Sequence, residues 1–491
     1  FPRFPVLLLA LSAASAAAQS RSIPPPADCV PVRQFIRQAI AEGRSPSVAV
    51  AVIRDNRVVW AEGFGTADRE RNIPATSDTI YWLASVSKPL TATGLMQLVE
   101  RGAIDLDKPA NTYLPGAKLR AHLGSADDIT IRRMANHTAG LPIHNNFFYA
   151  PARPPSMEET IRRYGFASLK PGTANQYSNL AFGILGYIVE TVSKTPWSRY
   201  QEKRVYDPLG MARTSDGIRP GHEREAAVPY AHDAAGRFVR VVPYDFDHRP
   251  ASAIWSTVND LARFARMHMN DGELDGVRVL TPESVREMRR MTGESRPGTG
   301  NGVAWLVGSL YGYEGAVSHN GGMPGVATVM NTFPKPRAAT IVLTNSDDRA
   351  LPVEISHRLA AVLFGDAPPQ QAARPGAPGA AEGPPALAGS WRGRVAHPDG
   401  AIAVVLTVKQ EGGVDVAFEG RPPLSLSRVA LTESTLRGQV QALVATQEGF
   451  HGIPELTFAL ARDGDRLTGV CSAFVPSYFT LPFWMELERS R

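Results

Sequence analysis

The sequence has few cysteines and lacks the motifs of several hydrolase classes. Only two cysteines occur, Cys29 and Cys471, and no His-Glu-x-x-His or clustered Cys/His spacing is present, so we expect no metal and no other cofactor. No Gly-x-Ser-x-Gly is found, which disfavours an α/β-hydrolase. The two cysteines would pair in an oxidising compartment or remain separate thiols, and the sequence leaves both alternatives open.

Basic residues are not concentrated in any segment, although the net charge is +5 and the pI is about 9.2. No run of five lysines or arginines occurs, so we expect no nucleic-acid partner. No stretch of about 18 apolar residues occurs either, so we expect no membrane span. A small molecule or a short peptide is the expected substrate.

The first residues have the pattern of a secretory signal. Arg3 precedes the apolar residues 6–11, and three alanines at 16–18 are typical of a cleavage site before Gln19. We therefore expect a signal peptide at 1–18, a proline-rich tether at 19–32, and export to the periplasm or the medium.

A segment rich in proline, alanine and glycine at 366–385 predicts a linker between two domains. The chain beyond it, 386–491, alternates short strands with Gly/Asp turns and predicts a small antiparallel β-barrel. The chain before it, 33–365, predicts a mixed α+β domain. Apolar strands at both ends of that domain suggest a sheet in which its first and last strands are neighbours. The expected strands are at 48–53, 58–61, 326–331 and 340–344, and the expected helices at 85–100, 179–193, 259–270 and 282–291.

Ser85 and Lys88 are three residues apart, so on a helix they lie about one turn apart on one face. A lysine whose pKa is lowered by burial and nearby cations could take the proton of the serine hydroxyl. This spacing alone is weak evidence, because a serine three residues before a lysine also arises by chance.

Two further groups follow in the chain. Tyr177 and Asn179 offer a phenol for proton transfer and a carboxamide for orienting the lysine and the substrate. His319, Gly321 and Gly322 form a glycine-containing edge along which a substrate backbone could approach. The N–H of Gly322 and that of Ser85 would together form an oxyanion hole.

The order of these three groups resembles that of the serine β-lactamase and penicillin-binding-protein superfamily, in particular its class C-related branch. The resemblance covers about residues 33–360. It is also carried by the segments 48–53, 63–68, 131–142, 207–211, 256–261 and 343–346.

The resemblance implies an antiparallel sheet flanked by helices, with a helical subdomain beside it. It makes Ser85 the acylated nucleophile, Lys88 its base and Tyr177 the second acid/base group. Asn179, His319, Gly321 and Gly322 would bind and orient the substrate. His137, within 136–140, is expected to hold its loop rather than to react.

His319 stands where true β-lactamases usually carry a lysine, which weakens attraction for a substrate carboxylate. His-x-Gly instead resembles D-stereospecific aminopeptidases and related esterases. We therefore expect hydrolysis of short D-amino-acid peptides or amides first, small carboxylic esters second and β-lactams third. A penicillin-binding sensor that acylates without turnover is a further alternative.

The C-terminal domain resembles the barrel domains, some of them lipocalin-like, that are appended to certain D-aminopeptidases and self-compartmentalising peptidases. In those proteins the extra domain restricts access to the site or mediates assembly. Oligomerisation through this domain is therefore one option here. The aromatic segment 478–484 could serve either role, although it is also typical of a barrel's closing strand.

Overall fold

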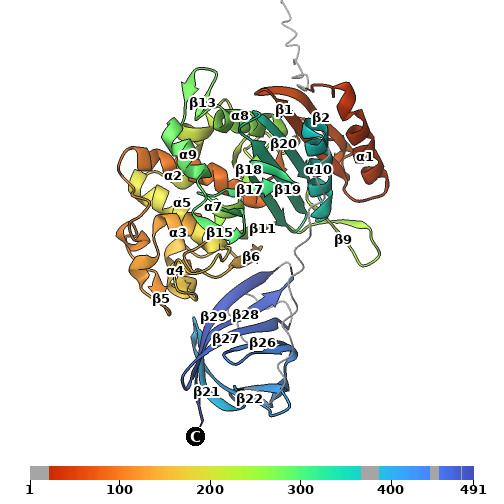
Figure 1. Ribbon diagram of the computed structural model, residues 1–491. Coiled ribbons are helices and arrows are strands. Elements are labelled where there is room, and N and C mark those ends of the chain that lie inside the picture. Colours follow the sequence, from red (N-terminus) through yellow and green to blue (C-terminus); the bar gives the residue numbers. More distant parts are fainter. Residues whose placement is uncertain (1–21, 366–385, 443–452, 477, 491) are drawn as a thin grey trace, which may run out of the picture.

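The computed structural model describes residues 22–365, 386–442, 453–476 and 478–490, which form a mixed helix/sheet domain and a β-barrel (Figure 1). The expected signal peptide and the expected linker lie outside the described residues. No helix within the described ranges is long and apolar enough to cross a membrane.

A nine-stranded antiparallel sheet forms the centre of the first domain. Its order is β15 (Gly293–Arg296), β16 (Thr299–Asn301), β17 (Leu306–Leu310), β18 (Tyr313–Met323), β19 (Val326–Phe333), β20 (Ala338–Thr344), β1 (Ser47–Arg54), β2 (Arg57–Asp68) and β3 (Ile73–Pro74). Strand β1 pairs with both β2 and β20, so the first and last long strands are neighbours, as the sequence predicts. Asp55 and Asn56 have positive φ angles of 48° and 61°, as suits the tight turn between β1 and β2.

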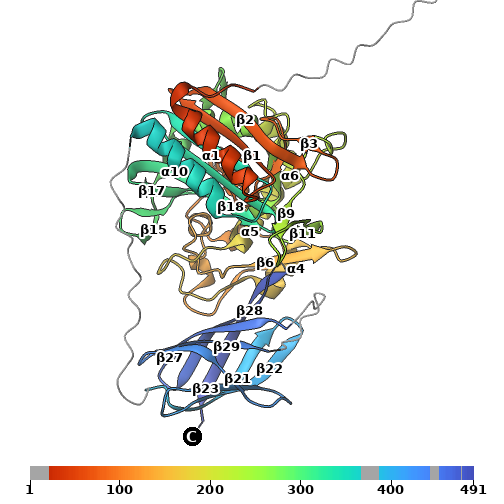
Figure 2. The ribbon, with the colours of Figure 1, turned by 90° about the vertical axis from the view of Figure 1, so that its right-hand side faces the viewer.

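Strand β1 is apolar on both faces because helices cover both. Val48, Val50 and Val52 pack under α1 (Val30–Ala41) and α10 (Ala350–Phe364), which lie together on one face of the sheet (Figure 2). Ala49, Ala51 and Ile53 belong to the larger core on the opposite face. The alternation of side chains along a strand explains why a continuous apolar run is needed here.

The larger core holds the helices that carry the expected catalytic residues. Three long helices belong to it, namely α2 (Ser87–Glu100), α5 (Asn179–Ser193) and α8 (Val258–Met269). The Ser178 hydroxyl caps α5 by accepting from the N–H of Ala181, so Ser178 rather than Asn179 is the capping residue. The shorter helices are α3 (Ile131–Ala135), α4 (Met157–Tyr164), α6 (Trp197–Gln201), α7 (Arg249–Ser252) and α9 (Pro282–Arg289).

The C-terminal domain is a nearly closed antiparallel barrel, which confirms the predicted fold class. Its strand order is β24 (Leu424–Ser425), β23 (Val414–Phe418), β22 (Gly400–Val408), β21 (Gly389–His397), β29 (Phe479–Arg489), β28 (Arg466–Val475), β27 (Glu455–Asp463), β26 (Thr435–Gln441) and β25 (Ser427–Leu431). Leu481, Phe483 and Met485 of β29 are buried in the barrel core, so the aromatic segment does include the closing strand.

The same strand also joins the barrel to the first domain. At its start, Phe479 and Thr480 pair with β6 (Asn145–Tyr149), which in turn pairs with β11 (Tyr244–Phe246). The N–H of Phe147 donates to the carbonyl of Tyr478 at 2.8 Å. Strand β29 is therefore a barrel strand at one end and part of the catalytic-domain surface at the other.

The two cysteines are both free and buried, so the disulfide considered from the sequence is not formed. Cys29 packs with α1 and α10, whereas Cys471 lies in the barrel. Burial raises the pKa of Cys29 to about 11 and that of Cys471 to about 12, so both are protonated thiols at neutral pH.

Candidate active site

Ser85 lies in a 3-10 turn, η2 (Ala84–Val86), between β4 (Tyr81–Trp82) and α2. This differs from the sequence expectation, which placed Ser85 in the first turn of the helix. Ala84 has a positive φ of 48°, an unfavourable conformation for a residue with a Cβ. The turn is held in place because the hydroxyl of Thr328 donates to the carbonyl of Leu83 at 2.8 Å.

Lys88 is fully buried in the first turn of α2. Its Nζ donates to Oδ1 of Asn179 at 2.7 Å and to the carbonyl of Ala251 at 3.2 Å. Both partners are uncharged, and burial lowers the pKa of Lys88 well below its ordinary value. The side chain can therefore be a neutral amine at physiological pH, as a general base must be.

Tyr177 lies beside both Ser85 and Lys88. The Ser85 side chain is near enough to the phenol to lower its pKa, and Nζ of Lys88 lies 4.8 Å from the ring centroid of Tyr177. Burial raises the pKa of Tyr177, so the phenol keeps its proton at neutral pH. His137 packs on the phenol ring at 4.4 Å between centroids, and its Nδ1 accepts from the N–H of Ser178. His137 thus supports the Tyr177 loop, in line with the sequence interpretation.

Asn179 is fixed at the start of α5 by three hydrogen bonds. Oδ1 accepts from Lys88, while Nδ2 donates to Oδ1 of Asn145 at 2.6 Å and to the carbonyl of His144 at 3.2 Å. The backbone carbonyl of His144 can only accept, so Nδ2 of Asn179 faces it and Oδ1 is left to accept from Lys88.

Strand β18 passes directly beside the turn that holds Ser85. A Cβ on Gly321 would lie 2.3 Å from the carbonyl oxygen of Leu83 and 3.0 Å from the N atom of Ser85, so only glycine fits this crossing. His319 is half-buried and hydrogen-bonds to the carbonyl of Asn320 through Nδ1 at 2.7 Å. Desolvation first, and the charge of Lys88 second, lower the pKa of His319, so it offers hydrogen bonds rather than a positive charge.

Gly321→Ala is expected to reduce kcat/KM for p-nitrophenyl acetate at least about tenfold and to lower the melting temperature. The added methyl group overpacks a site enclosed by backbone atoms of Leu83 and Ser85 and by Oγ1 of Thr328, which typically costs about 1–3 kcal/mol. Gly413→Ala in the barrel is the control, because its Cβ would meet only the Lys409 side chain at 3.4 Å. Equal behaviour of the two variants would contradict the steric role of Gly321.

A pocket of about 310 Å³ opens at Ser85. Asn179 and Gly322 line it, as the sequence analysis expects, but Arg349 and His248 do so as well. The Arg349 side chain lies against Gly322, where a Cβ would approach its Nε to 2.7 Å. The sequence analysis missed both residues, because neither belongs to a motif and each reaches the pocket only through the fold.

The barrel supplies part of the pocket wall. The pocket is lined there by Phe474, Val475 and Pro476 at the end of β28 and by Phe479 and Thr480 at the start of β29. The sequence analysis considered that this domain could restrict access to the site through segment 478–484, but which of its residues reach the pocket depends on the pairing of β29 with β6.

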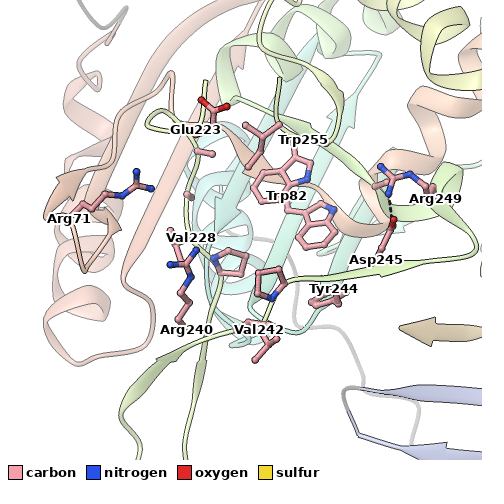
Figure 3. Close-up of a pocket in the computed structure, with 18 residues that line it drawn as sticks. Arg71, Trp82, Glu223, Val228, Arg240, Val242, Tyr244, Asp245, Arg249 and Trp255 are labelled. Carbon is pink, nitrogen blue, oxygen red and sulfur yellow. Dashed lines mark hydrogen bonds and ion pairs between the residues drawn. The ribbon is translucent and has the colours of Figure 1, made fainter. Parts of the chain in front are cut away.

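A second hollow of about 430 Å³ lies beside the nucleophile turn and is lined by a stack of aromatic rings (Figure 3). The Trp82 ring lies 4.9 Å from Trp255 and 5.0 Å from Tyr244, centroid to centroid. Its indole N–H donates to the carbonyl of Ser252 at 3.0 Å. Because Trp82 precedes Ser85 by three residues, this stack stabilises the approach to the nucleophile turn.

A serine followed three residues later by a buried lysine, with a phenol beside both, is the arrangement of the β-lactamase/transpeptidase-like serine hydrolases. The chain belongs to the beta-lactamase family, whose sequence pattern matches residues 32–363. The narrower class C-related branch stays a prediction.

The individual matches include an esterase and two solved structures that cover most of this chain. Esterase EstB of Burkholderia gladioli is 33% identical over 218 residues, which cover 42% of this chain and 55% of EstB. The octameric penicillin-binding protein homologue from Pyrococcus abyssi has a TM-score of 0.61 at 22% identity, covering 93% of this chain and all of its own. The structure of SurE with D-Leu has a TM-score of 0.60 at 21% identity, covering 93% of this chain and 99% of SurE.

Proposed function

We propose that the protein hydrolyses amides or esters through an acyl-enzyme on Ser85, with short D-amino-acid peptides or amides as the preferred substrates. The observation that carries the proposal is the set of contacts around Lys88. This amine is fully buried, its hydrogen-bond partners are uncharged, and it lies 4.8 Å from the ring centroid of Tyr177 and three residues after Ser85. A neutral base and a poised nucleophile are the two requirements of acyl transfer.

In the first half of the reaction, Lys88 accepts the Ser85 proton while the serine oxygen attacks the substrate carbonyl. The N–H groups of Ser85 and Gly322 would stabilise the oxyanion. Tyr177 then donates its proton to the leaving amine or alkoxide, and protonated Lys88 restores that proton. In the second half a water molecule attacks the acyl group, and the same groups return the proton to Ser85.

The preference for D-amino-acid substrates is supported by His319 and by one relative of the same fold. On strand β18, beside the Ser85 turn, a neutral imidazole stands where a β-lactamase usually carries a lysine. SurE, which shares the fold, has been solved with D-Leu. Small esters are the second candidate class, supported by the likeness to esterase EstB.

β-Lactams are the third candidate, supported by Arg349. This guanidinium lines the Ser85 pocket against Gly322, where a substrate carboxylate could pair with it. A kinetic panel of D- and L-alanine p-nitroanilide, p-nitrophenyl esters and nitrocefin tests the ranking. Highest kcat/KM on D-alanine p-nitroanilide supports the proposal, whereas highest kcat/KM on nitrocefin contradicts it. One equivalent of product followed by no turnover would indicate a penicillin-binding sensor.

Phe474→Ala is expected to widen the range of accepted acyl chains. Phe474 lines the pocket from the barrel while 40% of its surface is exposed, so truncation removes a wall with little loss of barrel stability. We expect the ratio of kcat/KM for p-nitrophenyl octanoate to that for the acetate to rise at least about fivefold. Ile453→Ala, an exposed barrel residue outside this pocket, should leave the ratio unchanged. No change in Phe474→Ala would mean that the barrel does not select substrates.

A further inference from the structure

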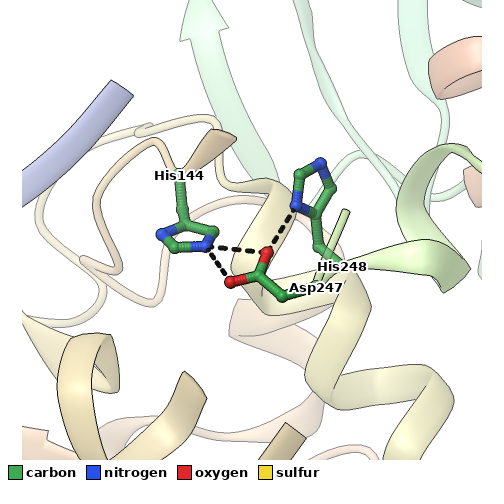
Figure 4. Close-up of side chains that lie close together, drawn as sticks. All are labelled: His144, Asp247 and His248. Carbon is green, nitrogen blue, oxygen red and sulfur yellow. Dashed lines mark hydrogen bonds and ion pairs between the residues drawn. The ribbon is translucent and has the colours of Figure 1, made fainter. Parts of the chain in front are cut away.

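Three buried side chains that the mechanism does not use form a linked group next to the pocket: His144, Asp247 and His248 (Figure 4). Nε2 of His144 lies 2.8 Å and 3.0 Å from the two carboxylate oxygens of Asp247. Nδ1 of His248 lies 3.0 Å from Oδ1 of the same carboxylate. The hydroxyl of Thr160 also donates to it, at 3.3 Å. Asp247 is thus an acceptor shared by two imidazoles and a hydroxyl.

His248 is the member of this group that reaches the Ser85 pocket. It is 1% exposed, yet it is one of the side chains that line the pocket. Figure 4 shows Nδ1 turned toward Asp247 and Nε2 on the far side of the ring. Among the residues that the structure describes, Nε2 has no hydrogen-bond partner. The fully enclosed ring nitrogen without a partner in this group is Nδ1 of His144, whereas Nε2 of His248 belongs to a side chain that lines the pocket and is therefore available to a ligand bound beside Ser85.

The protonation states of Asp247 and His248 determine what Nε2 of His248 can bind. Burial opposes ionisation of Asp247, but the two neighbouring imidazoles hold its pKa well below the ordinary value. Burial lowers the pKa of His248 despite the nearby carboxylate, so its ring is neutral. A neutral imidazole that donates Nδ1–H to a carboxylate carries a bare lone pair on Nε2. That atom is therefore an acceptor, polarised by the negative charge behind it.

We propose that Nε2 of His248 binds the free α-amino group of the substrate and thereby selects substrates with an amine beside the scissile carbonyl. This inference rests on the proposed function, because it assigns the substrate's amino group to a partner in the same pocket. A divalent metal held by the three side chains fits less well, because each histidine nitrogen that faces the carboxylate is already hydrogen-bonded to it.

The test compares D-alanine p-nitroanilide with propionic acid p-nitroanilide, which differ only in the amino group. The wild-type protein is expected to prefer the alanine compound at least about tenfold in kcat/KM. In His248→Asn the side-chain N–H can still donate to Asp247, but the Nε2 acceptor is gone. This variant is expected to lose the preference, through a roughly 10- to 100-fold fall on the alanine compound, while the propionyl compound stays within about threefold.

His248→Gln is the matched second variant, because its longer side chain can place a carbonyl oxygen near the position of Nε2. It is expected to keep part of the preference, and it keeps the inference testable where His248→Asn fails to fold. Equal losses on both compounds, or no wild-type preference, would overturn the inference. Loss of the preference after dialysis against EDTA, with recovery on adding Zn²⁺, would also overturn it in favour of a metal site.

Esters separate this inference from the proposed function. If p-nitrophenyl acetate is cleaved by the wild type and not by Ser85→Ala, while the amine preference is absent, the hydrolase assignment stands and the role of His248 falls. If Ser85→Ala cleaves the ester as fast as the wild type, both the assignment of Ser85 as nucleophile and the role of His248 are contradicted.

Discussion

Ser85→Ala is expected to lower the hydrolysis of p-nitrophenyl acetate to background, a loss of about 10⁴-fold or more, because no other group can form the acyl intermediate. The variant should also give no covalent adduct by mass spectrometry during turnover, where the wild type gives one of the mass of the acyl group. The fold should be unaffected, because Ser85 is partly exposed and its turn is held through the carbonyl of Leu83.

Ser87→Ala is the control for this experiment. Ser87 is buried two residues further on, and its hydroxyl accepts from the N–H of Ile254 at 3.1 Å. Its removal leaves a buried donor without a partner, which costs about 1–3 kcal/mol of stability. We therefore expect a lower melting temperature with activity kept within about tenfold. A Ser85→Ala protein that retained wild-type rates would refute the assignment of the nucleophile.

Lys88→Met is expected to abolish turnover about as completely as Ser85→Ala, because the methionine fills the buried space but cannot accept a proton. In the wild type, kcat/KM should rise with pH through a pKa below the ordinary 10.5 of lysine, since only the neutral amine acts as a base. A pH profile of kcat/KM for p-nitrophenyl acetate measures that pKa. Retained activity in Lys88→Met would contradict the role of the base.

The depressed pKa of Lys88 also predicts how the free energy of unfolding of the wild type, relative to Lys88→Met, changes with pH. Because the folded pKa of Lys88 is depressed, the unfolded chain binds one more proton than the native protein at pH values between the folded pKa and about 10.5. The free energy of unfolding of the wild type should therefore rise with pH relative to Lys88→Met, by about 1.4 kcal/mol per pH unit. Urea unfolding of both proteins at pH 8.5 and 9.5 measures the difference. A constant difference would mean that Lys88 is charged in the native state.

Much of this fold could be predicted because the local patterns agree with the packing. The helix expected at 179–193 has these bounds in the structure, and β1 and β20 lie side by side as expected. The residues around Lys88 could also be predicted. Ser85, Tyr177 and Asn179 lie in short motifs whose order along the chain resembles that of the family. These features depend on periodicity and spacing, which a single sequence contains.

Other features could not be predicted, because they depend on contacts between distant segments. The positive φ of Ala84 reflects packing around the nucleophile turn, not an alanine preference. His248 has no motif of its own, and reaches the pocket only because Asp247 and His144 meet across 103 residues of chain. The barrel wall requires β29 to pair with β6, more than 300 residues earlier. The free cysteines likewise lie in cores that the sequence does not place relative to each other.

The position of β1 between β2 and β20 has a consequence for synthesis on the ribosome. Strand β1 is among the first to emerge, but its second neighbour ends at Thr344, nearly 300 residues later. Until then one edge of a strand that is apolar from Val48 to Ile53 has no partner, and such an edge is prone to aggregation. Folding of the hydrolase domain therefore cannot be completed co-translationally before residue 344 has left the exit tunnel, so the nascent chain needs protection over most of its length.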